Sequence, residues 1–378
     1  MFESIPWWMW IAGFLAVLGP LILVHELGHY LVGRWFGVKA EAFSIGFGKE
    51  IAGWTDKRGT RWKLSALPLG GYVQFKGDMN PASVPDAEQV ANASPEEREG
   101  SFHHATLWKR ALIVFAGPAT NLIVTLLIFA GFFMAFGKPV AADPEEQLTI
   151  ATFTEQSAAR DAGLEIGDRI VAIDGKRMEG FRDVQDAVMF HPDTVLEVEV
   201  LRNGREETVS VRTASQELTD RFGNVSRIGL MGIEASEVRY DFEGVGVGEA
   251  LAMSVEQTRR LTDMMVTGIV QIVTGKRSLE ELGGPIKIAK FSGEQLSLGP
   301  LSYVNFVALI SLNLAFINLL PIPALDGGHL AFYAAEAVRR KPLGPRSQEW
   351  AYRTGIALVL MLMLVVTVND VASLALFG

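Results

Sequence analysis

The feature that most constrains this chain is a pair of histidines with a glutamate between them, placed directly after a long uncharged stretch. His25-Glu26-Leu27-Gly28-His29 follows Trp7–Val24, eighteen residues without a charged side chain. Residues at positions i and i+4 share one face of a helix, so both imidazoles can bind one metal ion, while Glu26 can accept a proton. Ionisable groups inside an apolar span cost on the order of 2.5–3.5 kcal/mol each and occur mainly where they have a function. The pattern predicts zinc chemistry at membrane depth; a chance match on a helix is the alternative.

Three further apolar stretches raise the expected number of membrane spans to four. Ala111–Gly137 and Gly299–Leu325 contain no charge, and Thr354–Asn369 continues past Asp370. A helix needs roughly 20 apolar residues to cross a bilayer. The composition agrees, with 49% hydrophobic residues, 20% charged residues and a mean hydropathy of +0.23. The alternative is a soluble protein, which would need four buried helices with the length and hydropathy of a membrane span.

The first stretch is interpreted as a retained helix rather than a secretory signal. The first basic residue is Arg34, and the run contains the histidine cluster instead of ending at a cleavage site. The loops between spans one and two and between spans three and four are rich in Lys and Arg, which predicts that both face the cytoplasm. The two termini and the segment between spans two and three are then expected on the other side.

Composition argues against two classes of chemistry. The chain has no cysteine, which removes disulfides, thiolate metal ligands and thiol nucleophiles. Its formal net charge is −9 and it has no basic stripe with interleaved aromatic residues, so nucleic acid is not an expected partner.

The segment between spans two and three contains a polar domain over Leu148–Thr213. Strands are predicted at Thr149–Phe153 and Asp168–Gly175, short helices at Ser157–Gly163 and Phe181–Phe190, and a hairpin turn at Asn203-Gly204. This order, with Gly-Leu-Glu-Ile-Gly-Asp ending at Asp168, resembles a PDZ domain. Such domains bind extended peptides at an open strand edge, and a peptide C-terminus is the expected ligand. A small spacer that binds nothing is the alternative.

A second chemical motif, Asn318-Leu-Leu-Pro-Ile-Pro-Ala-Leu-Asp326-Gly-Gly, closes the third stretch. Pro321 and Pro323 remove backbone donors and should end the helix there. Catalytic zinc sites commonly use three protein ligands and keep a fourth position open, so Asp326 is expected as the third ligand beside His25 and His29. A helix terminator with the aspartate in a surface turn is the alternative.

The remaining histidines are weaker candidates. His103 and His104 lie in a polar loop and are expected to be solvated, and His191 precedes a proline in the polar domain. His329 lies three residues after Asp326 and could orient a ligand, although a solvated position at the start of a helix is the preferred interpretation.

His-Glu-x-x-His in the first span, Asn-x-x-Pro-x-Pro-x-Leu-Asp-Gly in the third and a PDZ-like domain between spans two and three resemble the site-2 protease family of intramembrane zinc metalloproteases, RseP-like members in particular. The resemblance implies that His25, His29 and Asp326 bind Zn²⁺, that Glu26 activates water and that Asn318 handles substrate. One departure is that only one PDZ-like copy is found, because Ala214–Glu249 is too short and irregular for a second.

The resemblance also implies a functional role for two other segments. Phe43–Val73 alternates apolar and polar residues around Lys57-Arg58-Gly59 and looks like the family's membrane-associated β-sheet, whose edge can pair with an unwound substrate. A hairpin that only anchors at the interface is the alternative. Gly117-Pro118-x-x-Asn121 resembles a family motif near the active site, with helix packing as the alternative. The expected substrate-binding residues are Asn318, Gly46, Gly48, Arg61, Trp62, Lys63 and Leu64.

The expected fold class is an α-helical polytopic membrane protein of about four spans with a membrane-associated β-hairpin or sheet and an inserted α+β PDZ domain. An interfacial helix is expected over Gly248–Thr274. The expected segments are 1–36, span one with His-Glu-x-x-His; 37–107, the β-hairpin region and loop; 108–138, span two; 139–235, the PDZ domain and an extension; 236–298, amphipathic helices; 299–337, span three with Leu-Asp-Gly; and 338–378, a cytoplasmic loop and span four.

The expected function is an intramembrane zinc metalloendopeptidase that cleaves the transmembrane segment of a single-span protein. The resemblance implies regulated intramembrane proteolysis in the bacterial inner membrane, an anti-sigma factor as substrate, and an active site near the cytoplasmic side. Two alternatives stay open. A non-catalytic PDZ-bearing scaffold with a structural zinc would have no use for Glu26, and a metal transporter would need ionisable residues along a path through the spans rather than in one cluster.

Overall fold

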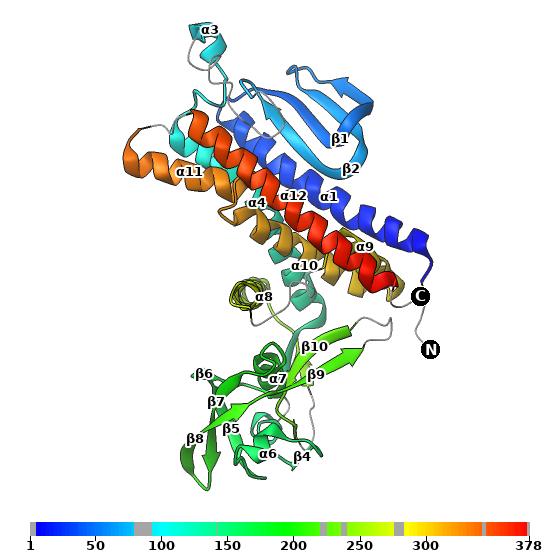
Figure 1. The fold of residues 1–378 in the computed structure, drawn as a ribbon, viewed down its shortest axis with the longest axis vertical. Helices are drawn as coiled ribbons and strands as arrows, with labels where there is room; N and C mark the ends of the chain where they lie inside the picture. The colour runs from blue at the N-terminus through cyan, green and yellow to red at the C-terminus, as the bar shows by residue number, and fades with distance from the viewer. Residues whose placement is uncertain are drawn as a thin grey trace. The chain divides into compact units, whose positions relative to one another are not determined.

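Figure 1 traces the computed structural model of the chain, which describes residues 5–78, 93–141, 143–219, 225–235, 240–275, 283–341 and 345–375. The chain divides into two compact units. The membrane unit comprises Ile5–Phe129, Ser254–Thr262 and Leu282–Gly378, and the α+β unit comprises Met1–Ser4, Ala130–Met253 and Asp263–Glu281.

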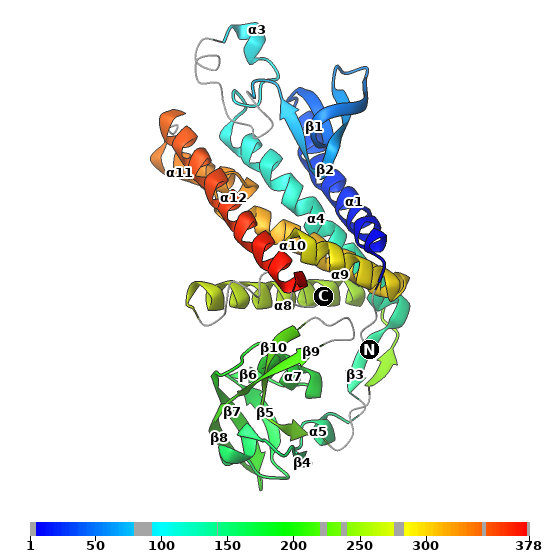
Figure 2. The ribbon, with the colours of Figure 1, turned by 45° about the vertical axis from the view of Figure 1, so that its right-hand side comes forward.

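Four helices in the described part of the chain are long and apolar enough to cross a membrane, which confirms the predicted count. They are α1 (Trp7–Trp35), α4 (Leu107–Phe136), α10 (Pro300–Leu319) and α12 (Pro345–Ala375), the last with its apolar window at Trp350–Ala372. α10 ends before the uncharged stretch does. Pro321 and Pro323 lack backbone N–H groups, so the chain leaves the helix there, and α11 (Asp326–Arg339) starts a new one (Figure 2).

The one acid in the fourth apolar stretch has a structural partner. Asp370 of α12 is fully buried, and its carboxylate accepts hydrogen bonds of 3.0 Å from the backbone N–H groups of Gly284, Ile286 and Lys287. These residues form the start of α9 (Pro285–Ser297). A carboxylate at a helix N-terminus satisfies donors that have no partner within the helix and interacts favourably with the helix dipole. Asp370 therefore joins α12 to α9 within the apolar layer.

The segment between α1 and α4 forms a sheet from two long strands, β1 (Ala40–Thr55) and β2 (Arg61–Phe75). The two strands pair antiparallel with several register shifts, so that more than one part of each enters the sheet. Residues 42–45 pair with 71–74 and also with 61–64, while 61–64 pair in addition with 52–55. The 61–64 segment therefore lies inside the described sheet, whose free edges are 71–75 and 50–55.

This arrangement confirms the predicted hairpin but corrects its edge. The expectation that Arg61–Leu64 offer an open edge to a substrate is wrong, because β1 pairs with this segment on both sides. The alternation of apolar and polar residues indicates strands, but it does not give their order. Gly46 and Gly48 have φ values of +90° and +86° and lie where β1 changes partners, a conformation that other residues rarely adopt.

The end of β2 is held by a buried polar contact. The Asp78 carboxylate accepts a hydrogen bond from the Phe75 N–H (2.9 Å) and lies 2.9 Å from the His103 Nε2 atom. The His103 side chain is 9% exposed, so the expectation that it is solvated is wrong. His104 lies in the same turn, 3.1 Å from the Ser101 hydroxyl, shortly after the short helix α3 (Pro95–Arg98).

The α+β unit contains a four-stranded sheet in the order β6-β5-β7-β8. The predicted strand, helix and hairpin positions of this segment are confirmed, including the turn at Asn203-Gly204, where both φ values are positive (49° and 78°). The elements, in chain order, are β3 (Lys138–Ala141), α5 (Pro144–Gln147), β4 (Thr152–Phe153), α6 (Ala158–Asp161), β5 (Arg169–Ile173), β6 (Lys176–Arg177), α7 (Phe181–Met189), β7 (Val195–Arg202), β8 (Arg205–Arg212), β9 (Ala214–Thr219), β10 (Val225–Leu230), β11 (Ile233–Glu234), β12 (Tyr240–Glu243) and α8 (Val247–Val273).

The segment after Thr213 completes this unit instead of forming a second one. β9 pairs with β10, β11 pairs back with β4, and β12 pairs with β3 at the start of the unit. The domain therefore extends beyond the Leu148–Thr213 segment that the sequence pattern marked. The amphipathic stretch predicted at Gly248–Thr274 is the helix α8.

A buried ion pair fixes the hairpin of the α+β unit to its neighbouring loop. The Arg202 guanidinium lies 2.6 Å from an Asp168 carboxylate oxygen and also donates to the Gly163 carbonyl oxygen (3.0 Å). The Asp168 side chain is 1% exposed. Burial alone would raise the pKa of Asp168, but the hydrogen bonds from Arg202 and from the Glu165 N–H outweigh it and hold that pKa below its ordinary value.

Candidate metal centre

The site begins with two imidazoles on one face of α1. His25 and His29 are one helical turn apart, and their Nε2 atoms lie 3.2 Å from each other. Both residues are 9% exposed. The apolar sequence around them favours a continuous helix, and this helix holds the two rings at a fixed separation within the membrane unit.

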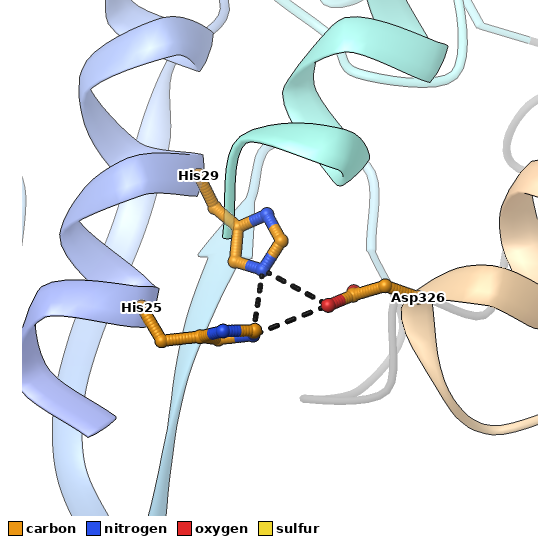
Figure 3. Close-up of side chains that lie close together, drawn as sticks. All are labelled: His25, His29 and Asp326. Atoms are coloured by element: carbon orange, nitrogen blue, oxygen red, sulfur yellow. Dashed lines mark hydrogen bonds and ion pairs between the residues drawn. The ribbon is translucent and has the colours of Figure 1, made fainter. Parts of the chain in front are cut away.

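Asp326, the first residue of α11, completes the group. One carboxylate oxygen lies 3.1 Å from the His25 Nε2 atom and 3.5 Å from the His29 Nε2 atom, as Figure 3 shows. Bonds of about 2.0–2.1 Å to a tetrahedral zinc ion place neighbouring ligand atoms about 3.3 Å apart. The three observed separations are close to this value, so the spacing fits one ion with a fourth position left open.

The backbone of α4 closes one side of the group at Gly117. A Cβ atom on Gly117 would lie 2.1 Å from the His29 Nε2 atom and 2.8 Å from the His25 Nε2 atom. A side chain here would fill the space in front of both metal-binding nitrogens. The motif Gly117-Pro118-x-x-Asn121 therefore lies at the site, as its resemblance to a family motif predicted. Helix packing, the alternative interpretation, is also present: a Cβ on Gly28 of α1 would lie 2.8 Å from the Thr120 hydroxyl oxygen.

The His29 ring is oriented by the main chain of α4. Its Nδ1 atom lies 2.8 Å from the Ile113 carbonyl oxygen, which can only accept a hydrogen bond. The proton of the neutral ring is therefore held on Nδ1, and the Nε2 lone pair faces His25 and Asp326. Metal-binding histidines almost always have such a partner, because it fixes both tautomer and orientation.

Glu26 lies between these ligands and the free edge of the sheet. Its carboxylate interacts electrostatically with His25, His29 and Asp326 and accepts a hydrogen bond from the backbone of Val73. Gly71, two residues earlier in β2, lies so close that an added Cβ would be 3.0 Å from the Glu26 side chain. A proton acceptor, three metal-binding groups and a strand edge are thus brought together.

Two of the other residues expected to bind substrate have partners within the sheet, and Asn318 lies at the end of α10. Asn318 lies in the last turn of α10, half-buried, just before the chain breaks toward Asp326. Trp62 stacks on Phe43 with ring centroids 4.5 Å apart, and the Arg61 guanidinium pairs with Glu50 at 2.5 Å. Arg61 and Trp62 therefore hold the sheet together, while Asn318 remains a candidate.

The structure corrects the expectation for His329. This residue is not solvated, since its Nε2 atom lies 2.9 Å from the Tyr352 hydroxyl of α12. His191 contacts the Ala187 carbonyl oxygen at 2.8 Å in the α+β unit. The contacts of Ile113 and Val73 could not be predicted from the sequence, because any residue type can supply a backbone group.

Comparison with known proteins agrees with this chemistry. The profile of Peptidase family M50 matches residues 13–362. The chain is 44% identical over 367 residues to a protein of Agrobacterium fabrum named as a zinc metalloprotease, covering 97% of this chain and 96% of the relative. It is 42% identical over 363 residues to one of Rhizobium meliloti with a name of the same kind, covering 96% of each. It is 34% identical over 386 residues to the metalloprotease MmpA of Caulobacter vibrioides, covering 95% and 94%.

The family match and these relatives support a protease over a scaffold or a transporter. They agree with the three metal-binding groups that meet in the membrane unit. The chain therefore belongs to peptidase family M50, the site-2 proteases, and is a zinc metalloprotease with membrane-spanning helices.

Proposed function

We propose that this protein cleaves the transmembrane segment of single-span membrane proteins. The observation that carries the proposal is the location of His25, Glu26 and His29 inside α1, a helix of 29 residues with the length and hydropathy of a membrane span. A hydrolytic group at this position reaches peptide bonds that a soluble protease cannot. The resemblance in sequence points to regulated intramembrane proteolysis, with an anti-sigma factor as the substrate class.

The proposed roles follow from the geometry. His25, His29 and Asp326 hold the zinc ion, which, when bound, supplies Lewis-acid chemistry by acidifying water and polarising a carbonyl group. Glu26 takes a proton from the attacking water and returns it to the leaving amine. The Val73 backbone orients the Glu26 carboxylate for this task. Asn318 donates a hydrogen bond to the substrate backbone.

The substrate must lose helical hydrogen bonds before its peptide bond can be attacked. In the membrane the released backbone groups need partners, since an unsatisfied group there costs several kcal/mol. The 71–75 edge of β2 has no strand partner on its outer side among the described residues and lies beside Glu26. The Val73 and Phe75 N–H groups bond to Glu26 and Asp78, so the outward carbonyl groups of this edge are the ones left to pair with a substrate. We assign the substrate strand to this edge in place of the 61–64 segment, so that strand addition offsets unwinding at the place of cleavage.

The orientation proposal places the active site near the cytoplasmic side of a bacterial inner membrane. Arg34 follows His29 by five residues, and the segment before α4 is rich in Lys and Arg. Both termini and the α+β unit then face the periplasm. Because the chain has no native cysteine, single cysteines introduced at exposed positions such as Lys57 and Glu206 report the side directly. An impermeant thiol reagent added to intact cells should label position 206 and spare position 57; the reverse labelling would invert the proposed topology.

The α+β unit is proposed to bind a peptide C-terminus as a PDZ domain does. It contains a groove of about 840 Å³ between α7 and the 228–233 segment, with Val184, Val188, Ile228 and Leu230 among its lining residues. A labelled peptide with a free carboxylate should bind to the purified chain, and Ile228→Lys should abolish the binding, because Ile228 is partly exposed and the charge would lie in the apolar groove. Equal binding of a C-terminally amidated peptide would contradict carboxylate recognition.

The whole proposal is tested with the purified full-length chain in detergent and a single-span substrate. Cleavage within the transmembrane segment should stop on addition of a zinc chelator and return when zinc is restored. Cleavage only outside the membrane segment, or cleavage that persists without metal, would contradict it.

A further inference from the structure

Asn121 of α4 is buried beside the metal-binding group and has an unusual hydrogen-bonding situation. The residue is 0% exposed, and its amide nitrogen Nδ2 lies 3.3 Å from the His25 Nδ1 atom. Its amide oxygen Oδ1 is buried without a hydrogen-bond partner among the described residues. A buried polar atom left without a partner costs about 1–3 kcal/mol, so the position calls for an explanation.

The chemistry of His25 decides which end of the amide is needed. The Nε2 atom of His25 faces His29 and Asp326, so this nitrogen is the one that binds metal. A neutral imidazole that binds metal through Nε2 carries its proton on Nδ1, which is then a donor. An amide oxygen can accept that proton, whereas an amide nitrogen would oppose one donor with another. A half-turn about the last side-chain torsion exchanges the two ends of the amide with almost no change in its shape.

We infer that Asn121 is the positioning residue of His25, accepting a hydrogen bond from its Nδ1–H through Oδ1. The role matches that of the Ile113 carbonyl oxygen toward His29. α4 thus supplies one acceptor to each histidine: a backbone carbonyl where the main chain is near and an amide side chain where it is farther away.

The main chain at Asn121 is held firmly enough for this role. Its carbonyl oxygen accepts hydrogen bonds from the Ser311 hydroxyl of α10 (2.8 Å) and from the Thr125 hydroxyl (3.1 Å). Thr125 is also fully buried and bonds in addition to the Ala308 carbonyl oxygen (3.2 Å), but it has no recorded contact with His25. Thr125 bonds to Asn121 only at its carbonyl oxygen, which Ser311 also holds, and Thr125→Val leaves the Asn121 side chain unchanged. Thr125 therefore offers a control for packing on the same helix.

The test measures zinc affinity of the full-length chain by competition with a chelator of known affinity. Asn121→Leu removes the acceptor at similar volume and should weaken zinc binding about 10- to 100-fold, the usual effect of losing such a partner. Asn121→Asp keeps an acceptor oxygen and should stay within about threefold of the wild type by the same reasoning. Thr125→Val should leave the affinity unchanged. If Asn121→Leu does not fold, Asn121→Ala takes its place with the same expectation.

Three results would overturn the inference: wild-type affinity in Asn121→Leu, an equal loss in Asn121→Asp, or an equal loss in Thr125→Val, which would make the effect one of packing. The inference rests on the proposed ligand set, and His25→Ala separates the two. Full zinc occupancy in His25→Ala would remove His25 from the ligands, whereas a loss there together with normal affinity in Asn121→Leu would contradict the role of Asn121 alone.

Discussion

Glu26→Gln should stop peptide-bond hydrolysis and leave the zinc in place. Glutamine has nearly the same shape as glutamate but cannot take a proton from water, and general acid–base catalysis contributes about 10²- to 10⁴-fold to a rate. The metal-binding group consists of His25, His29 and Asp326, so it remains complete in this variant. Turnover of the single-span substrate and zinc content per chain are measured on the same preparation.

The matched control for this prediction is His25→Ala, which should lose both the metal and the activity. A second control is Glu50→Gln, which changes a carboxylate that pairs with Arg61 in the sheet and should retain activity. Residual turnover of Glu26→Gln above about a hundredth of the wild type would mean that another group accepts the proton, because a lost general base costs at least about a hundredfold.

Val73→Pro should reduce cleavage of transmembrane substrates roughly 10- to 100-fold while zinc content stays normal. The Val73 backbone bonds to the Glu26 carboxylate, and the Phe75 N–H bonds to Asp78. Both N–H groups therefore point away from β1, as the two-residue period of a strand requires. Proline removes the outward donor of Val73 but spares the ladder to β1.

Two control variants test whether the effect comes from the missing N–H group at the 71–75 edge. Val73→Ala keeps the N–H group and should stay near the wild type. Ile51→Pro introduces proline at the other free edge of the sheet, at a position of β1 that has no pairing partner in β2, and should also be harmless. Helix-breaking residues in the substrate should partly restore cleavage by Val73→Pro if strand addition is what the variant loses, since they lower the cost of unwinding. A loss that such substrates leave unchanged would instead come from the Glu26 carboxylate, which the Val73 N–H no longer holds. Equal losses in Val73→Pro and Ile51→Pro would leave no special role for the 71–75 edge.

Motifs with a chemical requirement could be predicted from the sequence. The spacing of His25 and His29 places them on a common face whatever the rest of the fold. Two prolines close together, Pro321 and Pro323, follow the end of α10, whereas a single proline stays inside α1 and inside α4. Four uncharged stretches predicted the four candidate spans, because length and hydropathy alone decide whether a helix can cross a bilayer.

Contacts made through space could not be predicted in the same way. The order of segments in the β1–β2 sheet depends on register shifts, so the alternation of residues does not show that Arg61–Leu64 lie inside the sheet. His103 is polar and lies in a polar loop, yet it is buried because Asp78 is brought against it. The Ile113 carbonyl oxygen orients His29 but belongs to a residue whose side chain gives no hint of that role.

The metal-binding group is divided between segments far apart in the sequence, and this has a consequence for biosynthesis. His25 and His29 of α1 are synthesised some three hundred positions before Asp326 of α11. During translation α1 lies in the membrane among other newly inserted helices, which are the kind of substrate proposed for the finished enzyme. The group of three ligands can assemble only after α11 has been synthesised. The order of the sequence thereby keeps the nascent protease without its third ligand until α11 has been made.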